Sequence, residues 1–261
     1  MSVLFFDCDG VLADTERHGH LPAFNKTFED FGLPVRWSDE DYAELVRIGG
    51  GKERMATLFA DRELVEKADL PTDPQGQKET LLEWHKRKTA AYKDLVFSGA
   101  MPARPGIDRI VDEAIEAGWI LAVASTSAEE SVRAVLEHAV GKEKARHFSV
   151  FGGDVVPAKK PDPAIYTLAL ERTGANPDET IVVEDSRNGL LAAVGAGLRC
   201  LVTVSSYTQE EDMSEAILVV SSLGDPGEPA RVLANRSPAK PGEYITLGDL
   251  EACLRAPSIR G

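Results

Sequence analysis

The chain begins with a short apolar run that stops at two carboxylates. Val3-Leu4-Phe5-Phe6 leads directly into Asp7-Cys8-Asp9-Gly10. An apolar run of this length that ends near a glycine predicts a buried β-strand followed by a turn. Because side chains alternate along a strand, Asp7 and Asp9 should lie on the same side of the strand end, where their charges repel each other. A hard cation such as Mg2+ would remove this repulsion; a pair of capping or turn aspartates is the alternative interpretation.

The remainder of the chain predicts an all-helical stretch followed by alternating strands and helices. From about residue 16 to residue 98 the signals are mainly helical, and no strand is evident. Beyond a proline and glycine cluster at 102–106, short apolar runs alternate with helical segments. The expected strands are 119–124, 148–151, 180–183, 199–204 and 216–220. The expected helices are 107–117, 128–140, 161–173, 188–195 and 246–254. Residues 224–244, rich in proline and glycine, are expected to form an ordered surface loop.

This order of elements predicts an α/β fold with an inserted domain. Strands that alternate with helices form βαβ crossovers, which produce a parallel sheet. We therefore expect a Rossmann-like parallel-sheet core over 1–15 and 99–261, and a small all-helical cap domain over 16–98, inserted after the first strand. Because the insertion leaves the core directly after Asp9 and returns before Arg104, the cap is expected to cover the carboxylates as a lid.

The composition limits the partners of this protein. Its 261 residues carry a formal net charge of −14, which argues against nucleic acid because phosphate backbones require a basic face. The three cysteines, Cys8, Cys200 and Cys253, show neither a disulfide framework nor a zinc spacing, so we expect a reducing compartment. No apolar run approaches membrane-spanning length, and a strand that begins at residue 3 argues against a signal peptide. We expect a soluble monomer without a nucleic-acid or membrane partner.

Chemically useful side chains are expected at four strand ends. In a parallel sheet, ligands bind at the carboxyl ends of the strands. The residues at this edge are Asp7 and Asp9, Ser125 and Thr126, Lys159 and Lys160, and Glu184 and Asp185. Each pair alone has an ordinary explanation, as a helix cap or a solvated loop. Together they gather acids, a hydroxyl and a lysine, and a Mg2+ ion with a phosphate would balance their charge.

Four segments resemble known motifs. Asp7-Cys8-Asp9-Gly10-Val11, Ser125, Lys160-Pro161 and Glu184-Asp185-Ser186 match, in order, the four motifs of the haloacid dehalogenase-like hydrolases. The resemblance covers the whole chain, and the helical insertion is similar to the small helical cap of that family. It implies a Mg2+-dependent enzyme. The second aspartate, Asp9, resembles the phosphatases and mutases of the family, because the dehalogenases lack it.

The resemblance also implies a role for each motif residue. Asp7 would attack phosphorus and form an aspartyl-phosphate, while Asp9 would protonate the leaving alcohol and then activate water. Ser125 would hydrogen-bond the transferring phosphoryl group, and Lys160 would offset its charge and that of Asp7. The implied magnesium ligands are Asp7, the backbone carbonyl of Asp9, and Asp185, with Glu184 in support. Catalysis would then rest on positioning and electrostatics, as expected for phosphoryl transfer.

The inserted helical stretch carries the candidates for substrate recognition. One candidate is the segment Gly49-Gly50-Gly51-Lys52-Glu53-Arg54. Its glycines let the backbone approach a ligand closely, and its lysine and arginine add two cations, which suits a second phosphate. The alternative is a turn that links two helices and carries solvated charges. A second basic cluster precedes Thr89, and Lys88 is the preferred contact there. Glu16 and His20 could hydrogen-bond sugar hydroxyls, although a lone histidine is more often structural. The predicted substrate-binding residues are Glu16, His20, Gly50, Gly51, Lys52, Arg54, Lys88, Thr126, Ser127 and Ser131.

These cap residues narrow the resemblance. Gly50-Gly51-Lys52-Glu53-Arg54 and Lys88-Thr89 resemble the Calvin-cycle-associated branch of the family that includes xylulose-1,5-bisphosphate phosphatase. The resemblance implies hydrolysis of the C1 phosphate of xylulose 1,5-bisphosphate, a misfire product that inhibits Rubisco, to give xylulose 5-phosphate. Residues 48–55 and Gly224-Asp225-Pro226 resemble plastid members, which implies the chloroplast stroma, or the cytoplasm if the source is bacterial. Arg17-His18-Gly19 carries one extra residue relative to bacterial members.

Other functions fit the same motifs. A β-phosphoglucomutase-like phosphosugar mutase uses the same two aspartates and differs in the lifetime of the aspartyl-phosphate. A phosphoglycolate phosphatase or a broad sugar-phosphate phosphatase would share the whole mechanism. A catalytically idle sugar-phosphate-binding protein is disfavoured, because all four motifs are intact.

Overall fold

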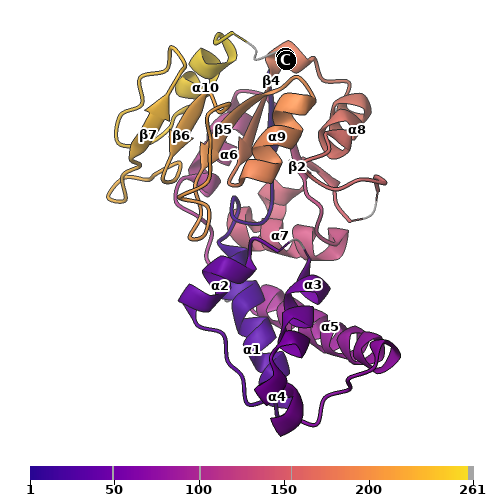
Figure 1. Cartoon of the computed structure of the whole chain (residues 1–261). Coiled ribbons are helices and arrows are strands. Elements are labelled where there is room, and N and C mark those ends of the chain that lie inside the picture. Colours follow the sequence, from indigo (N-terminus) through magenta and orange to yellow (C-terminus); the bar gives the residue numbers. More distant parts are fainter. Residues whose placement is uncertain (49, 100, 154, 258–261) are drawn as a thin grey trace. The chain divides into compact units, whose positions relative to one another are not determined.

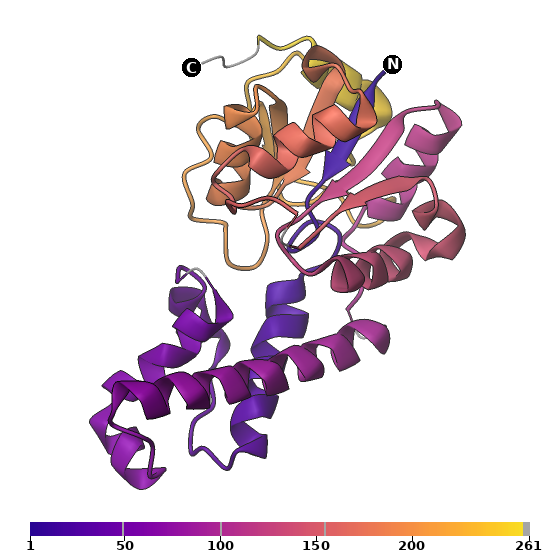
Figure 2. The same ribbon diagram turned by 90° about the vertical axis from the view of Figure 1, so that its right-hand side faces the viewer.

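The computed structural model describes residues 1–48, 50–99, 101–153 and 155–257. The chain divides into two compact units. Met1–Asp14 and Met101–Gly261 form an α/β core unit, and Thr15–Ala100 form a helical unit. Figures 1 and 2 show the elements of each unit.

Within the described residues, the core unit is built on one seven-stranded sheet with the order β3-β2-β1-β4-β5-β6-β7 (Figure 1). The strands are β1 (Val3–Phe6), β2 (Ile120–Ala124), β3 (Phe148–Phe151), β4 (Thr180–Glu184), β5 (Arg199–Thr203), β6 (Leu218–Val220) and β7 (Val232–Asn235). β1 lies in the interior of the sheet and pairs in parallel with β2 and β4, and among these strands only the β6–β7 pair is antiparallel. The predicted α/β fold with a Rossmann-like parallel sheet is confirmed.

The burial of the first strand agrees with its position in the interior of the sheet. All four residues of β1 are fully buried, as expected for a strand that is covered by helices on both faces. Val3 and Phe5 pack in one hydrophobic cluster with Ile165 of α8 and Leu190 of α9. The residue that follows this continuous apolar run, Asp7, therefore lies at the carboxyl edge of the sheet, between the ends of β2 and β4.

The helices of the core unit follow the predicted alternation. They are α6 (Ile107–Glu116), α7 (Glu129–Ala145), α8 (Ala164–Thr173), α9 (Arg187–Gly195) and α10 (Leu247–Leu254). α10 starts at a capping box in which Thr246 and Asp249 bond each other's backbone N–H groups. α8 begins three residues later than predicted, with Pro163 at its N-cap. α7 continues past residue 140, across non-helical backbone at Gly141.

One expectation for the core unit is wrong. Residues 224–244 were expected to be a loop, but they contain β7, which pairs with β6 at the edge of the sheet. β7 has no buried residue, and Leu233 is 51% exposed. A strand that buries no side chain carries no hydrophobic pattern, so its pairing partner determines it rather than its own sequence.

The helical unit contains no strand among its described residues. Its elements are the π-helix Glu16–His20, α1 (Leu21–Asp30), α2 (Asp39–Leu45), α3 (Gly51–Ala56), a 3₁₀ turn over Thr57–Ala60, α4 (Arg62–Lys67) and α5 (Pro74–Phe97). Figure 2 shows α5 as a long helix that crosses α1, and the two helices pack against each other. Aromatic rings fill the interior; Phe24 lies 5.0 Å from Trp37 and 5.9 Å from Tyr42 between ring centroids. The predicted helix start at Ser38 is a capping box with Asp41.

A π-helical turn occupies the segment for which one extra residue was predicted. The backbone N–H of Leu21 donates to the carbonyl of Glu16, five residues earlier. A turn of this kind accommodates one more residue than an α-helical turn without breaking the helix.

In the part of the chain that the structure describes, no helix has both the length and the apolar character that a membrane crossing requires.

Candidate active site

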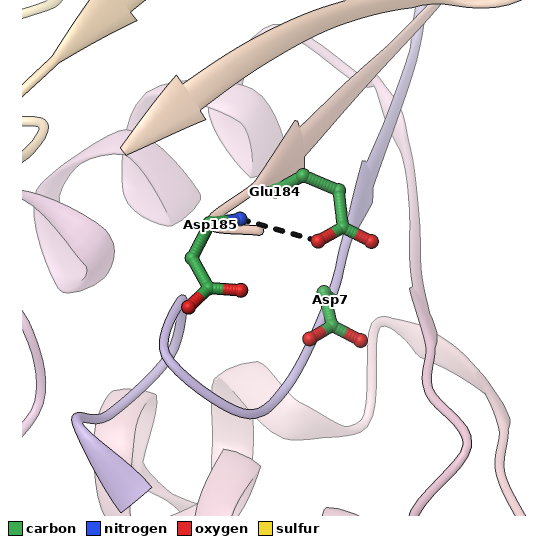
Figure 3. A group of neighbouring side chains, drawn as sticks. All are labelled: Asp7, Glu184 and Asp185. Carbon is green, nitrogen blue, oxygen red and sulfur yellow. Dashed lines mark hydrogen bonds between the residues drawn. The ribbon is translucent and has the colours of Figure 1, made fainter. Parts of the chain in front are cut away.

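Three carboxylates meet at the carboxyl edge of the core sheet. Asp7 follows β1, Glu184 ends β4, and Asp185 is the next residue. Because β1 and β4 pair in parallel, with Phe6 opposite Val183, their ends lie at the same level. One oxygen from each of Asp7, Glu184 and Asp185 lies within 4.8 Å of the other two, and all three residues are buried (Figure 3). Oxygen donors alone in a buried group are the ligand set that Mg2+ prefers.

Lys160 supplies the positive charge at this edge. Its Nζ donates to Asp7 Oδ1 at 2.6 Å, to Glu184 Oε1 at 2.6 Å and to the carbonyl of Ala124 at 3.0 Å. The hydroxyl of Tyr166 also donates to Glu184 Oε1, at 2.5 Å. One ammonium group therefore faces two carboxylates directly, with a third carboxylate, that of Asp185, beside them.

The pKa values of Asp7, Asp185 and Lys160 are all shifted at this edge. Burial raises the pKa of Asp7 to about 7, although Lys160 opposes the shift. Burial, followed by the charges of Glu184 and Asp7, raises the pKa of Asp185 well above its usual value. Burial lowers the pKa of Lys160, but the charges of Asp7 and Glu184 outweigh it and leave that pKa raised. The excess of negative charge fits a divalent cation, and the donor set is suited to Mg2+.

Two glycines make room for the carboxylates. Gly10 has φ +76°, and a Cβ atom there would lie 2.0 Å from Asp185 Oδ2. A Cβ atom on Gly189, in the first turn of α9, would lie 2.0 Å from the carboxyl group of Glu184. Both positions therefore require glycine, and the loop after β1 contacts Asp185 directly.

Asp9, in the loop after β1, bonds a serine segment at the end of the neighbouring strand β2. The Oγ of Ser127 donates to Asp9 Oδ2. The backbone N–H of Ser127 donates to Ser125 Oγ at 3.2 Å, and Ser125 is buried directly after β2. Thr126 is half-buried between them, and Ser131 is buried in the first turn of α7. The structure thus joins Asp9 to the serine segment, while the side chains of Asp7, Glu184 and Asp185 form the acid cluster.

In the helical unit, two predicted substrate-binding residues bond each other. Arg54 Nη1 lies 3.0 Å from Glu16 Oε2 and 2.5 Å from the hydroxyl of Tyr42, which itself donates to Glu16 Oε2 at 2.6 Å. Arg54 also donates to the carbonyls of Ile48, at 3.0 Å, and Val46, at 3.3 Å. Arg54 is 8% exposed, so in this structure it organises the segment before Gly50 rather than presenting a free cation.

The other predicted residues of this unit divide into buried and exposed groups. Lys88 is buried, and its Nζ lies 2.7 Å from His20 Nδ1 and 4.7 Å from the centre of the Phe24 ring. His20 stacks on Tyr92 at 4.1 Å between ring centroids. Lys52 and Gly50 are exposed, Gly50 has φ +101°, and Gly51 is the first residue of α3. Gly49 lies outside the described residues.

Sequence reasoning missed three residues that support these groups. Tyr166 bonds Glu184, Tyr42 bonds Glu16 and Arg54, and Arg104 donates to the carbonyl of Gly10 in the loop after β1. Tyr166 and Tyr42 occupy apolar positions of helices, where a buried hydroxyl gives no separate signal. Arg104 lies in the proline and glycine cluster that was interpreted only as a break between elements.

Comparison with known proteins identifies the family. Residues 1–197 match the haloacid dehalogenase-like hydrolases, and the chain belongs to this family. A CBBY-like protein of Arabidopsis thaliana is 48% identical over 227 residues, which are 87% of this chain and 70% of that protein. Protein CbbY of Cupriavidus necator is 38% identical over 232 residues, 88% of each chain.

A solved structure shows the same fold. The crystal structure of a CbbY mutant from Rhodobacter sphaeroides, in complex with xylulose-1,5-bisphosphate, has a TM-score of 0.71 at 39% identity. The match covers 85% of this chain and 95% of that chain. The predictions of the family and of a phosphatase enzyme of the CbbY type are confirmed.

Proposed function

We propose that this protein is a Mg2+-dependent phosphatase that converts xylulose 1,5-bisphosphate to xylulose 5-phosphate by removing the C1 phosphate. The observation that carries the proposal is the group formed by Asp7, Lys160, Glu184 and Asp185 at the carboxyl edge of the sheet. The similarity of this chain to a CbbY protein crystallised with xylulose-1,5-bisphosphate supports the choice of substrate.

In the proposed mechanism Asp7 is the nucleophile. Its carboxylate attacks the C1 phosphorus, the bond between phosphorus and the C1 oxygen breaks, and the phosphoryl group is transferred to Asp7 as an aspartyl-phosphate. Lys160 holds Asp7 Oδ1 at 2.6 Å and so fixes the carboxylate before the attack. Bound Mg2+, held by Asp7, Asp185 and the carbonyl of Asp9 with Glu184 in support, would supply positive charge toward the phosphoryl oxygens.

Asp9 is proposed to move the protons. It would donate a proton to the C1 oxygen as the sugar leaves, and would then accept a proton from the water that hydrolyses the aspartyl-phosphate. The hydrogen bond from Ser127 holds the Asp9 carboxyl group at the serine segment. Ser125 is proposed to donate to the transferring phosphoryl group, with Thr126, Ser127 and Ser131 also contributing to the substrate site.

The helical unit is proposed to bind the rest of the substrate. Lys52, exposed beside the backbone of Gly50 and Gly51, suits the second phosphate. Lys88 is proposed to contribute a second cation. Glu16 and His20 are proposed to contact the sugar hydroxyls, with Arg54 ordering Glu16 through their ion pair.

The experiment is a comparison of phosphate release with four substrates. Xylulose 1,5-bisphosphate, ribulose 1,5-bisphosphate, phosphoglycolate and glucose 1-phosphate are each supplied with Mg2+, and kcat/KM is measured. We expect the highest value for xylulose 1,5-bisphosphate, with release of one phosphate per sugar. Preference for phosphoglycolate would contradict the proposed substrate, and isomerisation of glucose 1-phosphate without free phosphate would indicate a mutase.

We also propose where and in what form the enzyme acts. The resemblance of residues 48–55 and Gly224-Asp225-Pro226 to plastid members supports a plastid phosphatase of the Calvin cycle that clears a Rubisco inhibitor from the stroma. The similarity to a plant protein agrees with this proposal, and a bacterial source would place the enzyme in the cytoplasm. An acidic chain of 261 residues is proposed to act as a monomer. Light scattering on a size-exclusion column tests this form, and a mass of two chains would contradict it.

A further inference from the structure

Arg104 holds the loop after β1 at two points. Its backbone N–H donates to the carbonyl of Leu12 at 3.0 Å. Its side-chain Nη1 donates to the carbonyl of Gly10. The loop itself closes through hydrogen bonds from the Leu12 N–H to the Cys8 carbonyl at 3.0 Å and from the Gly10 N–H to the Ala13 carbonyl at 2.9 Å. One residue therefore fixes the turn that begins just after Asp7.

The same guanidinium group joins this loop to two further strand ends. Its Nη1 donates to the carbonyl of Thr203 at 2.8 Å, and its Nη2 donates to the carbonyls of Val204 at 2.6 Å and Ser221 at 2.7 Å. Thr203 ends β5, Val204 follows it, and Ser221 follows β6. Arginine suits this position because its planar group offers five N–H donors, whereas lysine offers three.

The position of Gly10 matters for the acid cluster. Gly10 lies against Asp185 so closely that a Cβ atom would lie 2.0 Å from Asp185 Oδ2. Asp9 precedes Gly10 directly. A shift of Gly10 therefore displaces the peptide group between Asp9 and Gly10, and with it the carbonyl and the carboxyl group of Asp9. Arg104 is thus placed to set the distance between the loop and Asp185.

We infer that Arg104 is a positioning residue of the active site, which holds Asp9 and Gly10 in register with Asp185. The hydrogen bonds of its side chain go to the carbonyls of Gly10, Thr203, Val204 and Ser221 and to the Thr203 hydroxyl, so we infer that it acts through the loop. This inference rests on the proposed function, since it assigns to the loop the metal-binding carbonyl and the proton-transferring carboxyl group of Asp9. It also assigns a function to a residue that the four motifs do not include.

Arg109 provides a matched control in the same unit. Its Nη2 donates to the carbonyls of Leu223, at 3.2 Å, and Gly224, at 2.7 Å, and its Nε lies 3.4 Å from Asp225 Oδ1. Arg109 is therefore also a guanidinium group that ties backbone carbonyls together, but these carbonyls, at Leu223 and Gly224, do not belong to the loop after β1. Arg109→Ala therefore measures the loss of stability that follows when such a guanidinium group is removed away from the loop after β1.

The test compares Arg104→Ala, Arg104→Lys and Arg109→Ala in two measurements. The first is the rise in melting temperature on titration with Mg2+ alone, which gives an apparent dissociation constant for Mg2+ without any turnover. The second is kcat and KM for phosphate release from xylulose 1,5-bisphosphate. For Arg104→Ala we expect the Mg2+ constant to rise about 10-fold or more and kcat to fall about 100-fold, with KM changed little.

Controls separate positioning from simple loss of stability. Arg109→Ala should lower the melting temperature but leave the Mg2+ constant and kcat near those of the unaltered protein. Added guanidinium chloride at low concentration should restore part of the kcat of Arg104→Ala, and sodium chloride at equal concentration should not. If Arg104→Ala does not fold, Arg104→Lys, which keeps the charge but has fewer donors, should show the same changes at smaller size.

Two results would overturn different statements. In the first, Arg104→Ala and Arg109→Ala both lose stability, but the Mg2+ dissociation constant and kcat stay unchanged in Arg104→Ala and Arg104→Lys. Arg104 would then have no positioning role. In the second, the Arg104 variants bind Mg2+ more weakly than the unaltered protein, but the unaltered protein releases no phosphate from xylulose 1,5-bisphosphate. The inference about the loop would then stand, and the proposed function would fail.

Discussion

The carboxyl edge of the core sheet and the interior of the helical unit balance buried charge in different ways. At the sheet edge, Lys160 bonds two buried carboxylates, those of Asp7 and Glu184, and a third, that of Asp185, lies beside them. In the helical unit, Glu16 and Arg54 form a one-to-one ion pair, and the hydroxyl of Tyr42 bonds both. The pair in the helical unit is neutral, whereas the sheet edge carries excess negative charge. The comparison teaches that the negative charge at the sheet edge is not balanced by the side chains around it, which suits a cation, whereas the charge of Glu16 is balanced within the helical unit.

The largest effect is expected from removing Lys160. Lys160→Met leaves Asp7 and Glu184 buried without their cation, so the free energy of unfolding in EDTA should fall by about 3–5 kcal/mol. Urea denaturation measures the loss. Because the variant has more uncompensated negative charge, Mg2+ should raise its melting temperature by more than it raises that of the unaltered protein. A variant as stable as the unaltered protein would show that the charges at this edge are not coupled.

The corresponding change in the helical unit should respond differently to metal. Arg54→Met removes the cation from Glu16, which keeps only its hydrogen bond from Tyr42, and removes the arginine donors from the carbonyls of Val46 and Ile48. We expect a loss of about 1–3 kcal/mol in the free energy of unfolding. Adding Glu16→Gln to Arg54→Met should recover part of the loss, because no unpaired carboxylate then remains. Mg2+ should give both variants the same increase in melting temperature as the unaltered protein. A larger Mg2+ response in Arg54→Met would remove the contrast between the two regions.

Mg2+ itself should stabilise the unaltered protein through the sheet edge. At 100 times its dissociation constant, a ligand that binds only the folded state adds about 2.7 kcal/mol to the free energy of unfolding. Thermal denaturation with Mg2+ and with EDTA measures this increase. Asp185→Asn, which removes one carboxylate of the cluster, should abolish most of it. An increase that survives in Asp185→Asn would place the cation elsewhere.

The smallest effect is expected at Tyr166. Tyr166→Phe removes one hydrogen bond to Glu184 and leaves the carboxylates and Lys160 in place. We expect the free energy of unfolding to fall by about 1 kcal/mol, with a change in the Mg2+ dissociation constant below that caused by any loss of a carboxylate. Urea denaturation and Mg2+ titration measure both. A loss as large as that of Lys160→Met would make Tyr166 an essential partner of Glu184.

The sequence predicted the sheet edge well because local patterns carry that information. An apolar run that stops at a polar group marks both a buried strand and its end, so the places of Asp7, Ser125 and Glu184 could be predicted before their contacts were known. β7 could not be predicted in this way, since Val232 and Leu233 are exposed and the strand depends on pairing with β6.

The cap residues show a second limit. The glycine-rich segment predicted nearby cations, but it did not predict which of them would be buried. The structure buries Arg54 and Lys88 and exposes Lys52, because burial depends on partners distant in sequence, such as Glu16 and His20. Arg104 shows the same limit, since its acceptors are backbone carbonyls about 100 residues away in the chain, which leave no mark on the sequence.

Phosphate release by Asp7→Asn in the presence of Mg2+ tests the catalytic role of this edge most directly. The amide cannot act as the nucleophile, so we predict that kcat with xylulose 1,5-bisphosphate falls by on the order of 10⁴-fold or more while the variant stays folded. The melting temperature in EDTA provides the folding control. Turnover of Asp7→Asn within about tenfold of the unaltered protein, at an equal degree of folding, would contradict a mechanism through an aspartyl-phosphate at Asp7.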